Sequence, residues 1–112
     1  MRIISPFFLK NYGGKIINIH PSLLPSFRGV DAVKQAFDYG VKFSGCTTHF
    51  VDDSLDGGPI ILQSVVKRED EDTLESFKQR ILEEEHKILS KTIEIVSLGA
   101  YKQTRRYVKL EN

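Results

Sequence analysis

The sequence predicts an α/β fold. A β-branched segment, Lys15 to His20, lies between turn-forming residues, and two further strand-like segments cover Ser44 to Val51 and Ile60 to Val66. Apolar residues then recur at helical spacing from Thr73 to Leu98. With a shorter helical segment before the second strand, the predicted order is strand, helix, strand, strand, long helix, which is typical of α/β proteins.

The first elements are short and separated by glycine and proline. After Pro6, residues Phe7 to Tyr12 are expected to form a helical turn that ends at the following diglycine. Lys15 to His20 contains three isoleucines, which favour a buried strand. Pro21 and Pro25 bracket a loop, because proline cannot continue that strand inside a sheet.

The middle of the chain carries a helix and two paired strands. Val30 to Tyr39 has apolar residues three and four apart and is expected to be a helix that Gly40 ends. The loop Asp52 to Gly58 joins the strands Ser44 to Val51 and Ile60 to Val66. Because this connection is short, the two strands are expected to be antiparallel neighbours.

A long helix is expected from Thr73 to Leu98. Asp72 is the expected N-cap, with Glu75 three residues later, and Gly99 is the expected stop. Five apolar residues follow one face of this helix: Leu74, Phe77, Ile81, Ile88 and Val96. Glu85 falls on the same stripe. An inward carboxylate is costly unless it is paired, so Glu85 either binds a buried Arg or Lys or faces a ligand.

Composition excludes several classes of protein. A chain of 112 residues forms at most one domain, and its 16 basic and 15 acidic residues nearly cancel. This near-neutral charge gives no excess of positive charge that would attract nucleic acid or an acidic membrane. The basic segment Lys102 to Lys109 is expected to be a solvated tail. The single cysteine, Cys46, excludes an internal disulfide and favours a cytoplasmic setting, and no apolar run is long enough to span a membrane.

Asn18 and His20 are the first candidates for chemistry. They are two residues apart, so in a strand both side chains lie on one face. The strand ends at His20, and ligands of open α/β sheets bind beyond the carboxyl ends of the strands. The alternative is structural: Asn18 caps the turn, and His20 is a hydrogen-bonded core histidine.

Asp56 and His49 are the next candidates. Asp56 precedes a diglycine, which lets the backbone approach a ligand closely, although the motif by itself is more typical of a plain turn carboxylate. His49 lies on the strand before that loop and could be a core histidine. No tight metal-ligand spacing, phosphate loop or nucleophile motif is present in the sequence, so we expect no metal.

Several motifs resemble one known family. The Asn-x-His-Pro-Ser-Leu-Leu-Pro motif from Asn18 to Pro25 and the Leu-Asp-Gly-Gly-Pro motif from Leu55 to Pro59 are specific for the formyltransferase superfamily. Within it, the segments Met1 to Pro6, Gly45 to Val51 and Glu85-His86 resemble the folate-dependent phosphoribosylglycinamide formyltransferases of purine synthesis. Formyltetrahydrofolate deformylases are the nearest alternative, and methionyl-tRNA formyltransferases are more distant.

The resemblance implies an activity, a co-substrate and a set of site residues. The family transfers a formyl group from 10-formyltetrahydrofolate to the amine of glycinamide ribonucleotide. The matched catalytic residues are Asn18, His20 and Asp56, with His49 in support. Folate would contact Met1, Arg2, Ile3, Ile4, Asp53, Ser54, Leu55 and Asp56. The nucleotide substrate would contact Pro21 and Glu85. Asn18 and a protonated His20 would stabilise the oxyanion formed by amine attack, and Asp56 would hold His20 charged.

The resemblance also implies a Rossmann-like, three-layer α/β fold of which this chain matches the carboxyl-terminal half. The family's first parallel strand and its phosphate-binding loop have no counterpart here. We therefore expect residues 1–101 to be part of a catalytic domain, and residues 102–112 to be a basic tail. The strand Lys15 to His20 would present an apolar sheet edge, which a separate amino-terminal half or a second copy could cover. The chain would then be a truncated enzyme, one part of a split enzyme, or a non-catalytic half-domain.

Overall fold

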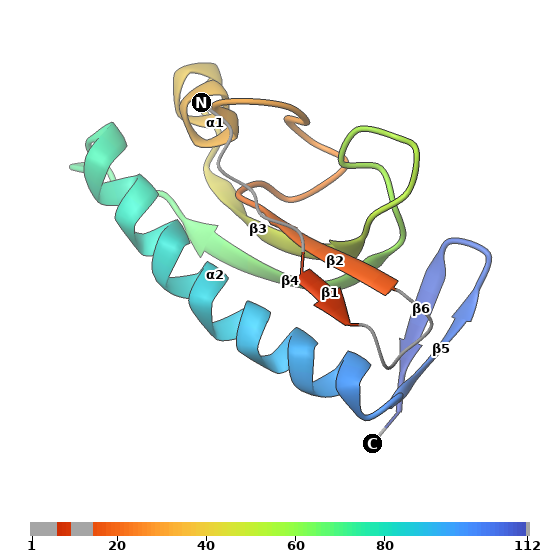
Figure 1. Ribbon diagram of the computed structural model, residues 1–112. Coiled ribbons are helices and arrows are strands. Elements are labelled where there is room, and N and C mark those ends of the chain that lie inside the picture. Colours follow the sequence, from red (N-terminus) through yellow and green to blue (C-terminus); the bar gives the residue numbers. More distant parts are fainter. Residues whose placement is uncertain (1–6, 10–14, 112) are drawn as a thin grey trace.

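The computed structural model describes residues 7–9 and 15–111. These residues form one mixed sheet in the strand order β1-β2-β3-β4-β6-β5, with two helices (Figure 1). The strands are β1 (Phe7–Leu9), β2 (Lys15–His20), β3 (Phe43–Phe50), β4 (Ile60–Lys67), β5 (Tyr101–Thr104) and β6 (Tyr107–Leu110). The helices are α1 (Ala32–Tyr39) and α2 (Leu74–Ser97). The predicted α/β class is confirmed.

The centre of the sheet follows the sequence prediction closely. β2 has the predicted bounds, and the predicted antiparallel pairing of β3 with β4 is present. β2 pairs with β3 antiparallel, with Ile17 opposite Phe50 and His20 opposite Thr47. The short helix α1 ends at Gly40, whose φ of 88° lies in the left-handed region that glycine tolerates.

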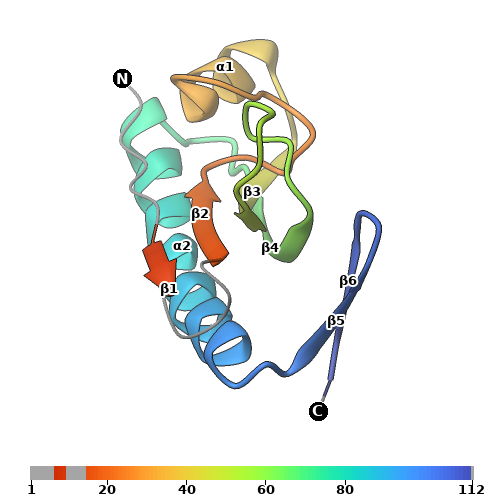
Figure 2. The ribbon, with the colours of Figure 1, turned by 45° about the vertical axis from the view of Figure 1, so that its right-hand side comes forward.

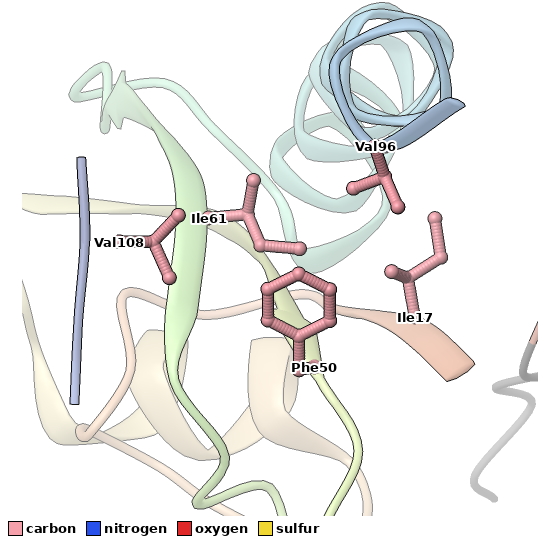
Figure 3. Packing of buried hydrophobic residues seen from close by; sticks show 5 residues of the cluster. All are labelled: Ile17, Phe50, Ile61, Val96 and Val108. Carbon is pink, nitrogen blue, oxygen red and sulfur yellow. The ribbon is translucent and has the colours of Figure 1, made fainter. Parts of the chain in front are cut away.

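The core lies between the sheet and α2. One cluster joins β2, β3, β4, α2 and β6 through Ile17, Phe50, Ile61, Val96 and Val108 (Figure 3). A second cluster joins α1 and α2 to β3 and β4 through Val33, Cys46, Val66, Phe77 and Ile81. Phe77, Ile81 and Val96 are fully buried, which confirms the predicted apolar face of α2.

The expected helical turn at Phe7 to Tyr12 is wrong where the structure describes it. Phe7–Leu9 is strand β1, which pairs antiparallel with β2 from Phe7 opposite Ile17 to Leu9 opposite Lys15. A strand edge leaves its N–H and C=O groups unpaired, so pairing there outweighs a weak local helix preference. β2 is therefore not an open edge along its whole length, since β1 pairs with residues 15–17.

The N-cap of α2 is Thr73 rather than the predicted Asp72. The Thr73 hydroxyl accepts a hydrogen bond from the Ser76 N–H at 3.1 Å, and the Ser76 hydroxyl accepts one from the Thr73 N–H at 3.0 Å. Asp72 instead binds the Arg80 guanidinium at 2.6 Å. The hydrogen bond and the positive charge of Arg80 hold the pKa of Asp72 well below its ordinary value. The predicted stop at Gly99 is confirmed by its φ of 64°.

The segment expected as a basic tail forms a β-hairpin. β5 and β6 pair antiparallel around a turn at Arg105, and Ile60 of β4 is opposite Tyr107 of β6 in parallel orientation. Val108 is buried against the core, while most neighbouring side chains are exposed. The hairpin stands apart from the central strands along most of its length (Figure 2).

Among the described residues, the structure contains no helix with the length and apolar character that crossing a membrane requires.

Candidate active site

The candidate site lies on the face of the sheet that α2 does not cover. Asn18 and His20 alternate with the core residue Ile17 along β2, and Asn18 is directly opposite His49 on β3. The polar side chains of these strands therefore lie on the same face. Asn18, His20 and His49 are 5%, 1% and 2% exposed, so their polar atoms need partners inside the protein or on a ligand.

The loop after β2 is folded back by two polar side chains of the sheet. The Thr47 hydroxyl donates to the Ser22 carbonyl at 2.7 Å and accepts from the Leu24 N–H at 3.1 Å. The Gln63 amide donates to the Leu24 carbonyl at 2.9 Å. This folding brings the carbonyl oxygen of Phe27 to within 2.8 Å of His20 Nε2.

Asp56 is buried and held in a fixed backbone conformation. Its φ is 51°, an uncommon value for a residue other than glycine, and the residue is 4% exposed. Its Oδ2 atom accepts a hydrogen bond from the Gly29 N–H at 2.9 Å. The same Oδ2 lies 3.5 Å from His20 Nδ1, and Oδ1 lies 3.9 Å from His49 Nε2. The structure thus brings three predicted residues together.

The hydrogen bonds of the two histidines decide which ring atoms face Asp56. His20 Nε2 and His49 Nδ1 each lie against a backbone carbonyl, of Phe27 at 2.8 Å and of Phe50 at 3.0 Å. A carbonyl only accepts, so each of these ring nitrogens carries a proton. The remaining nitrogen of each ring, His20 Nδ1 and His49 Nε2, faces the Asp56 carboxylate. The cluster therefore places two imidazole rings against one buried carboxyl group.

The two ends of the Asn18 side-chain amide have different surroundings. Its Oδ1 accepts from the Ile19 N–H at 2.9 Å. Within residues 7–9 and 15–111, its Nδ2 makes no hydrogen bond to a protein atom. An incoming oxygen could accept a hydrogen bond directly from that N–H group.

Glu85 lies on the other face of the sheet. It is half-buried on α2, the helix that packs on Cys46 and Thr48, and it makes no hydrogen bond or ion pair with the described residues. Burial raises the pKa of Glu85 to about 7. Of the two interpretations from sequence, pairing with a buried Arg or Lys is therefore not observed in the described structure.

The loop Asp52 to Gly58 combines an exposed tip with a buried end. Asp53, Ser54 and Leu55 are exposed, and Leu55 is 59% exposed despite its apolar side chain. Hydrogen bonds from the Ser54 hydroxyl and N–H, with a smaller contribution from nearby positive charge, lower the pKa of Asp52. Pro21 is half-buried directly after His20. Met1, Arg2, Ile3 and Ile4 lie outside the described residues.

Sequence analysis missed the residues that orient the site rather than react. Phe27 and Gly29 act through backbone atoms, and Thr47 and Gln63 act by folding a loop. Arg106, assigned to the tail, donates hydrogen bonds to the loop after Asp56. None of these contacts leaves a pattern along the chain. The described residues contain no group of three or more His, Cys, Asp or Glu side chains that could hold a metal ion.

Residues 1–93 match the model of the formyl transferase family. The chain belongs to this family. It is similar to phosphoribosylglycinamide formyltransferase of Bacillus subtilis, at 58% identity over 87 residues that cover 78% of this chain and 45% of the relative. It is also similar to formyltetrahydrofolate deformylase 2 of Arabidopsis thaliana, at 54% identity over 93 residues that cover 83% of this chain and 28% of that protein.

Solved structures of formyl transferases have the same fold. The phosphoribosylglycinamide formyltransferase of Anaplasma phagocytophilum superposes with a TM-score of 0.85 at 44% identity, covering 93% of this chain and 52% of that one. This likeness supports the predicted Rossmann-like α/β class. The chain spans about half the length of this formyl transferase, and 45% of the Bacillus subtilis relative.

Proposed function

We propose that this site takes part in transfer of a formyl group from 10-formyltetrahydrofolate to the amine of glycinamide ribonucleotide, in purine synthesis. The observation that supports this most is the buried Asp56 carboxylate between His20 and His49, 3.5 and 3.9 Å away. The similarity to phosphoribosylglycinamide formyltransferases adds support. Without a ligand to bind, these three buried polar side chains would be an unexplained cost to stability.

The residues of the chain suit the proton and charge movements that formyl transfer to an amine requires. The folate co-substrate supplies an electrophilic formyl carbon. The Asn18 Nδ2–H group, which has no protein acceptor in the described structure, would donate to the formyl oxygen as negative charge develops on it. A protonated His20 beside Asp56 would add positive charge, and Asp56 would receive or relay the amine proton. The bond from the formyl carbon to N10 of the folate would then break as N10 takes up a proton, which releases tetrahydrofolate.

The substrates would meet at the end of β2. The exposed loop residues Asp53, Ser54 and Leu55 suit a ligand with polar groups and an apolar ring system, because an exposed leucine lies next to a buried polar cluster. With Asp56 and residues 1–4, they are the proposed folate contacts. Pro21 and Glu85 are the proposed contacts of the nucleotide substrate. The charge balance of +1 offers no surface for nucleic acid or membrane, and we propose a cytoplasmic location.

A second polypeptide is the proposed partner for the remaining edge of β2. Among the described residues, the pairing of β1 with β2 covers residues 15–17 of β2. The Ile19 N–H is satisfied by the Asn18 side chain rather than by a neighbouring strand. An amino-terminal half-domain, or a second copy of this chain, could pair there and lie directly beside Asn18 and His20.

Deformylation is the alternative, since the chain is also 54% identical to a formyltetrahydrofolate deformylase. The same cluster could activate water instead of an amine. The two reactions differ in their acceptor alone. Formate released in the absence of glycinamide ribonucleotide would favour the deformylase.

The decisive experiment measures both products with and without complementation. The chain would be incubated with 10-formyltetrahydrofolate and glycinamide ribonucleotide, alone and with a recombinant amino-terminal half of the Bacillus subtilis relative. Formylated nucleotide and formate would be quantified by mass spectrometry. Formyl transfer that requires Asp56, tested with Asp56→Asn, would support the proposal.

A folded, complemented chain that produces neither product would refute the proposed function. Calorimetric titration with a non-reactive folate analogue, with circular dichroism on the same sample, would then show whether the chain is a non-catalytic half-domain.

A further inference from the structure

We propose that Arg106, at the turn of the β5–β6 hairpin, is a positioning residue for the Asp56 carboxylate. Its guanidinium Nη2 donates hydrogen bonds to the carbonyl oxygens of Gly57 at 2.5 Å and Gly58 at 3.4 Å. These two residues follow Asp56 directly in the chain. The inference rests on the proposed function for what the carboxylate does, but the contact itself is independent of any reaction.

The backbone that Arg106 binds, at Gly57 and Gly58, has little space for side chains. A Cβ atom on Gly57 would lie 2.4 Å from the Ser54 hydroxyl oxygen, and one on Gly58 would lie 1.7 Å from the Phe50 carbonyl oxygen. Because Gly58 meets backbone, it must be glycine, and with Gly57 beside it the segment has intrinsic conformational freedom. Hydrogen bonds from outside the loop are therefore needed to keep one conformation. A charged guanidinium donor forms stronger bonds than a neutral one.

The hairpin is attached to the sheet at the place where Arg106 acts. β6 is paired with β4 in the described structure only at Tyr107, opposite Ile60, and Arg106 immediately precedes that residue. Beyond this pair the strands diverge around a groove of about 610 Å³. Both ribbon views show the hairpin turn beside the loop from β3 to β4 (Figures 1 and 2). The hairpin therefore connects the end of α2 to the candidate active-site loop.

Displacement of this loop would change the distances on which the cluster depends. The Asp56 carboxylate accepts a hydrogen bond from the Gly29 N–H, and the backbone that follows Asp56 is held by the Arg106 bonds to the Gly57 and Gly58 carbonyls. Without Arg106, those carbonyls would bind water instead, and the loop would sample open conformations. The carboxylate would then spend less time next to His20 and His49.

The test compares Arg106→Met with Arg105→Asn in the full 112-residue chain. Both variants lose one positive charge at the same turn. Among the described residues, the Arg105 side chain makes no hydrogen bond or ion pair with the loop, and its φ of 55° is tolerated by asparagine. The readouts are amide hydrogen exchange of residues 53–58 and the NMR ring resonances of His20 and His49 across a pH series. Neither readout requires substrate or turnover.

For Arg106→Met we expect loop exchange to accelerate about tenfold or more, the factor that loss of one charge-assisted hydrogen bond corresponds to. The histidine resonances and their pH dependence should shift as well, while Arg105→Asn leaves both unchanged. Arg106→Lys keeps the charge with a different donor geometry, and should lie between the wild type and Arg106→Met. If Arg106→Met does not fold, Arg106→Lys serves as the test variant. In the complemented enzyme, kcat should fall more than KM rises.

Unchanged loop exchange and unchanged histidine resonances in folded Arg106→Met would overturn the proposal. So would equal effects of Arg105→Asn, because charge alone would then explain them. A folded, complemented wild-type chain that produces neither product would refute the proposed function only, since the exchange and resonance data would still decide the role of Arg106.

Discussion

The carboxylate of Glu85 should destabilise the folded chain at neutral pH, and Glu85→Gln should remove that effect. Glu85 is half-buried on α2 and has no hydrogen bond or ion pair with the described residues. Burial raises its pKa from 4.5 to about 7. The folded state therefore retains a proton on Glu85 over a pH range in which the unfolded chain has already lost it.

The sign and size of the effect follow from this difference. Between pH 4.5 and about 7 the folded state binds more protons than the unfolded state, so the free energy of unfolding falls as pH rises through that window. One pKa unit corresponds to about 1.4 kcal/mol, and solvent screening of this half-buried side chain reduces the full value, so the loss at pH 8 is about 1 to 3 kcal/mol. Glutamine carries no charge, so Glu85→Gln should be more stable than the wild type by that order at pH 8. The two proteins should be nearly equal at pH 4.

Urea unfolding followed by circular dichroism at pH 4 and pH 8 measures this difference. Glu84→Gln is the matched control on the adjacent position. Hydrogen bonds from the Ser64 hydroxyl and the Lys87 ammonium lower the pKa of Glu84. Its carboxylate therefore stabilises the fold above its unfolded pKa, and this stabilisation is lost as pH falls. Glu84→Gln should accordingly be less stable than the wild type at pH 8.

A gain in Glu85→Gln that is the same at both pH values would refute the reasoning, because it would reflect helix propensity or packing instead of a buried charge. A loss of stability at pH 8 would mean that the carboxylate has a stabilising partner. The expected result would agree with the proposed role of Glu85, since a carboxylate that costs stability without a ligand suits a contact with a polar substrate.

Three further predictions test the site and its surroundings. Asp56→Asn should lower formyl transfer by about 10²- to 10⁴-fold with little change in the unfolding midpoint, because asparagine can still accept from the Gly29 N–H; activity within tenfold of the wild type would show that the carboxylate is dispensable. Burial, with nearby carboxylates, raises the pKa of the Cys46 thiol to about 12, so iodoacetamide should alkylate the native chain far more slowly than the urea-unfolded chain by mass spectrometry. Equal rates would place Cys46 at the surface. Gly58→Ala should cost about 1 to 3 kcal/mol in urea unfolding, because its Cβ would meet the Phe50 carbonyl; an unchanged unfolding free energy would mean that the loop moves away at no cost.

The sequence was most informative where local and tertiary preferences agree. β2 combines β-branched residues with a buried position, and its bounds were predicted from the chain alone. The long helix was also predicted, because a periodic apolar face and a glycine stop are both local patterns. Its N-cap was misplaced by one residue. Both Asp72 and Thr73 are good caps, and the ion pair with Arg80 decided between them.

Predictions failed where a distant segment decided the outcome. Phe7–Leu9 is a strand because the edge of β2 offers hydrogen-bonding groups, which no local pattern around Phe7 reveals. The hairpin of β5 and β6 has a charged sequence that indicates a solvated tail. Val108 and Tyr101 nevertheless pack on the core, and these contacts depend on the positions of the sheet and α2.

The sequence by itself determined the α/β class and the identity of the groups that could react. Strand and helix periodicities are encoded in neighbouring residues, and the motifs around Asn18, His20 and Asp56 are contiguous. Only the tertiary structure decided which of these groups meet. The Asp56 carboxylate comes between His20 and His49 because the loop from β3 to β4 folds back onto the end of β2. Distances of this kind depend on backbone hydrogen bonds between segments far apart in the chain, so they leave no trace in its local sequence.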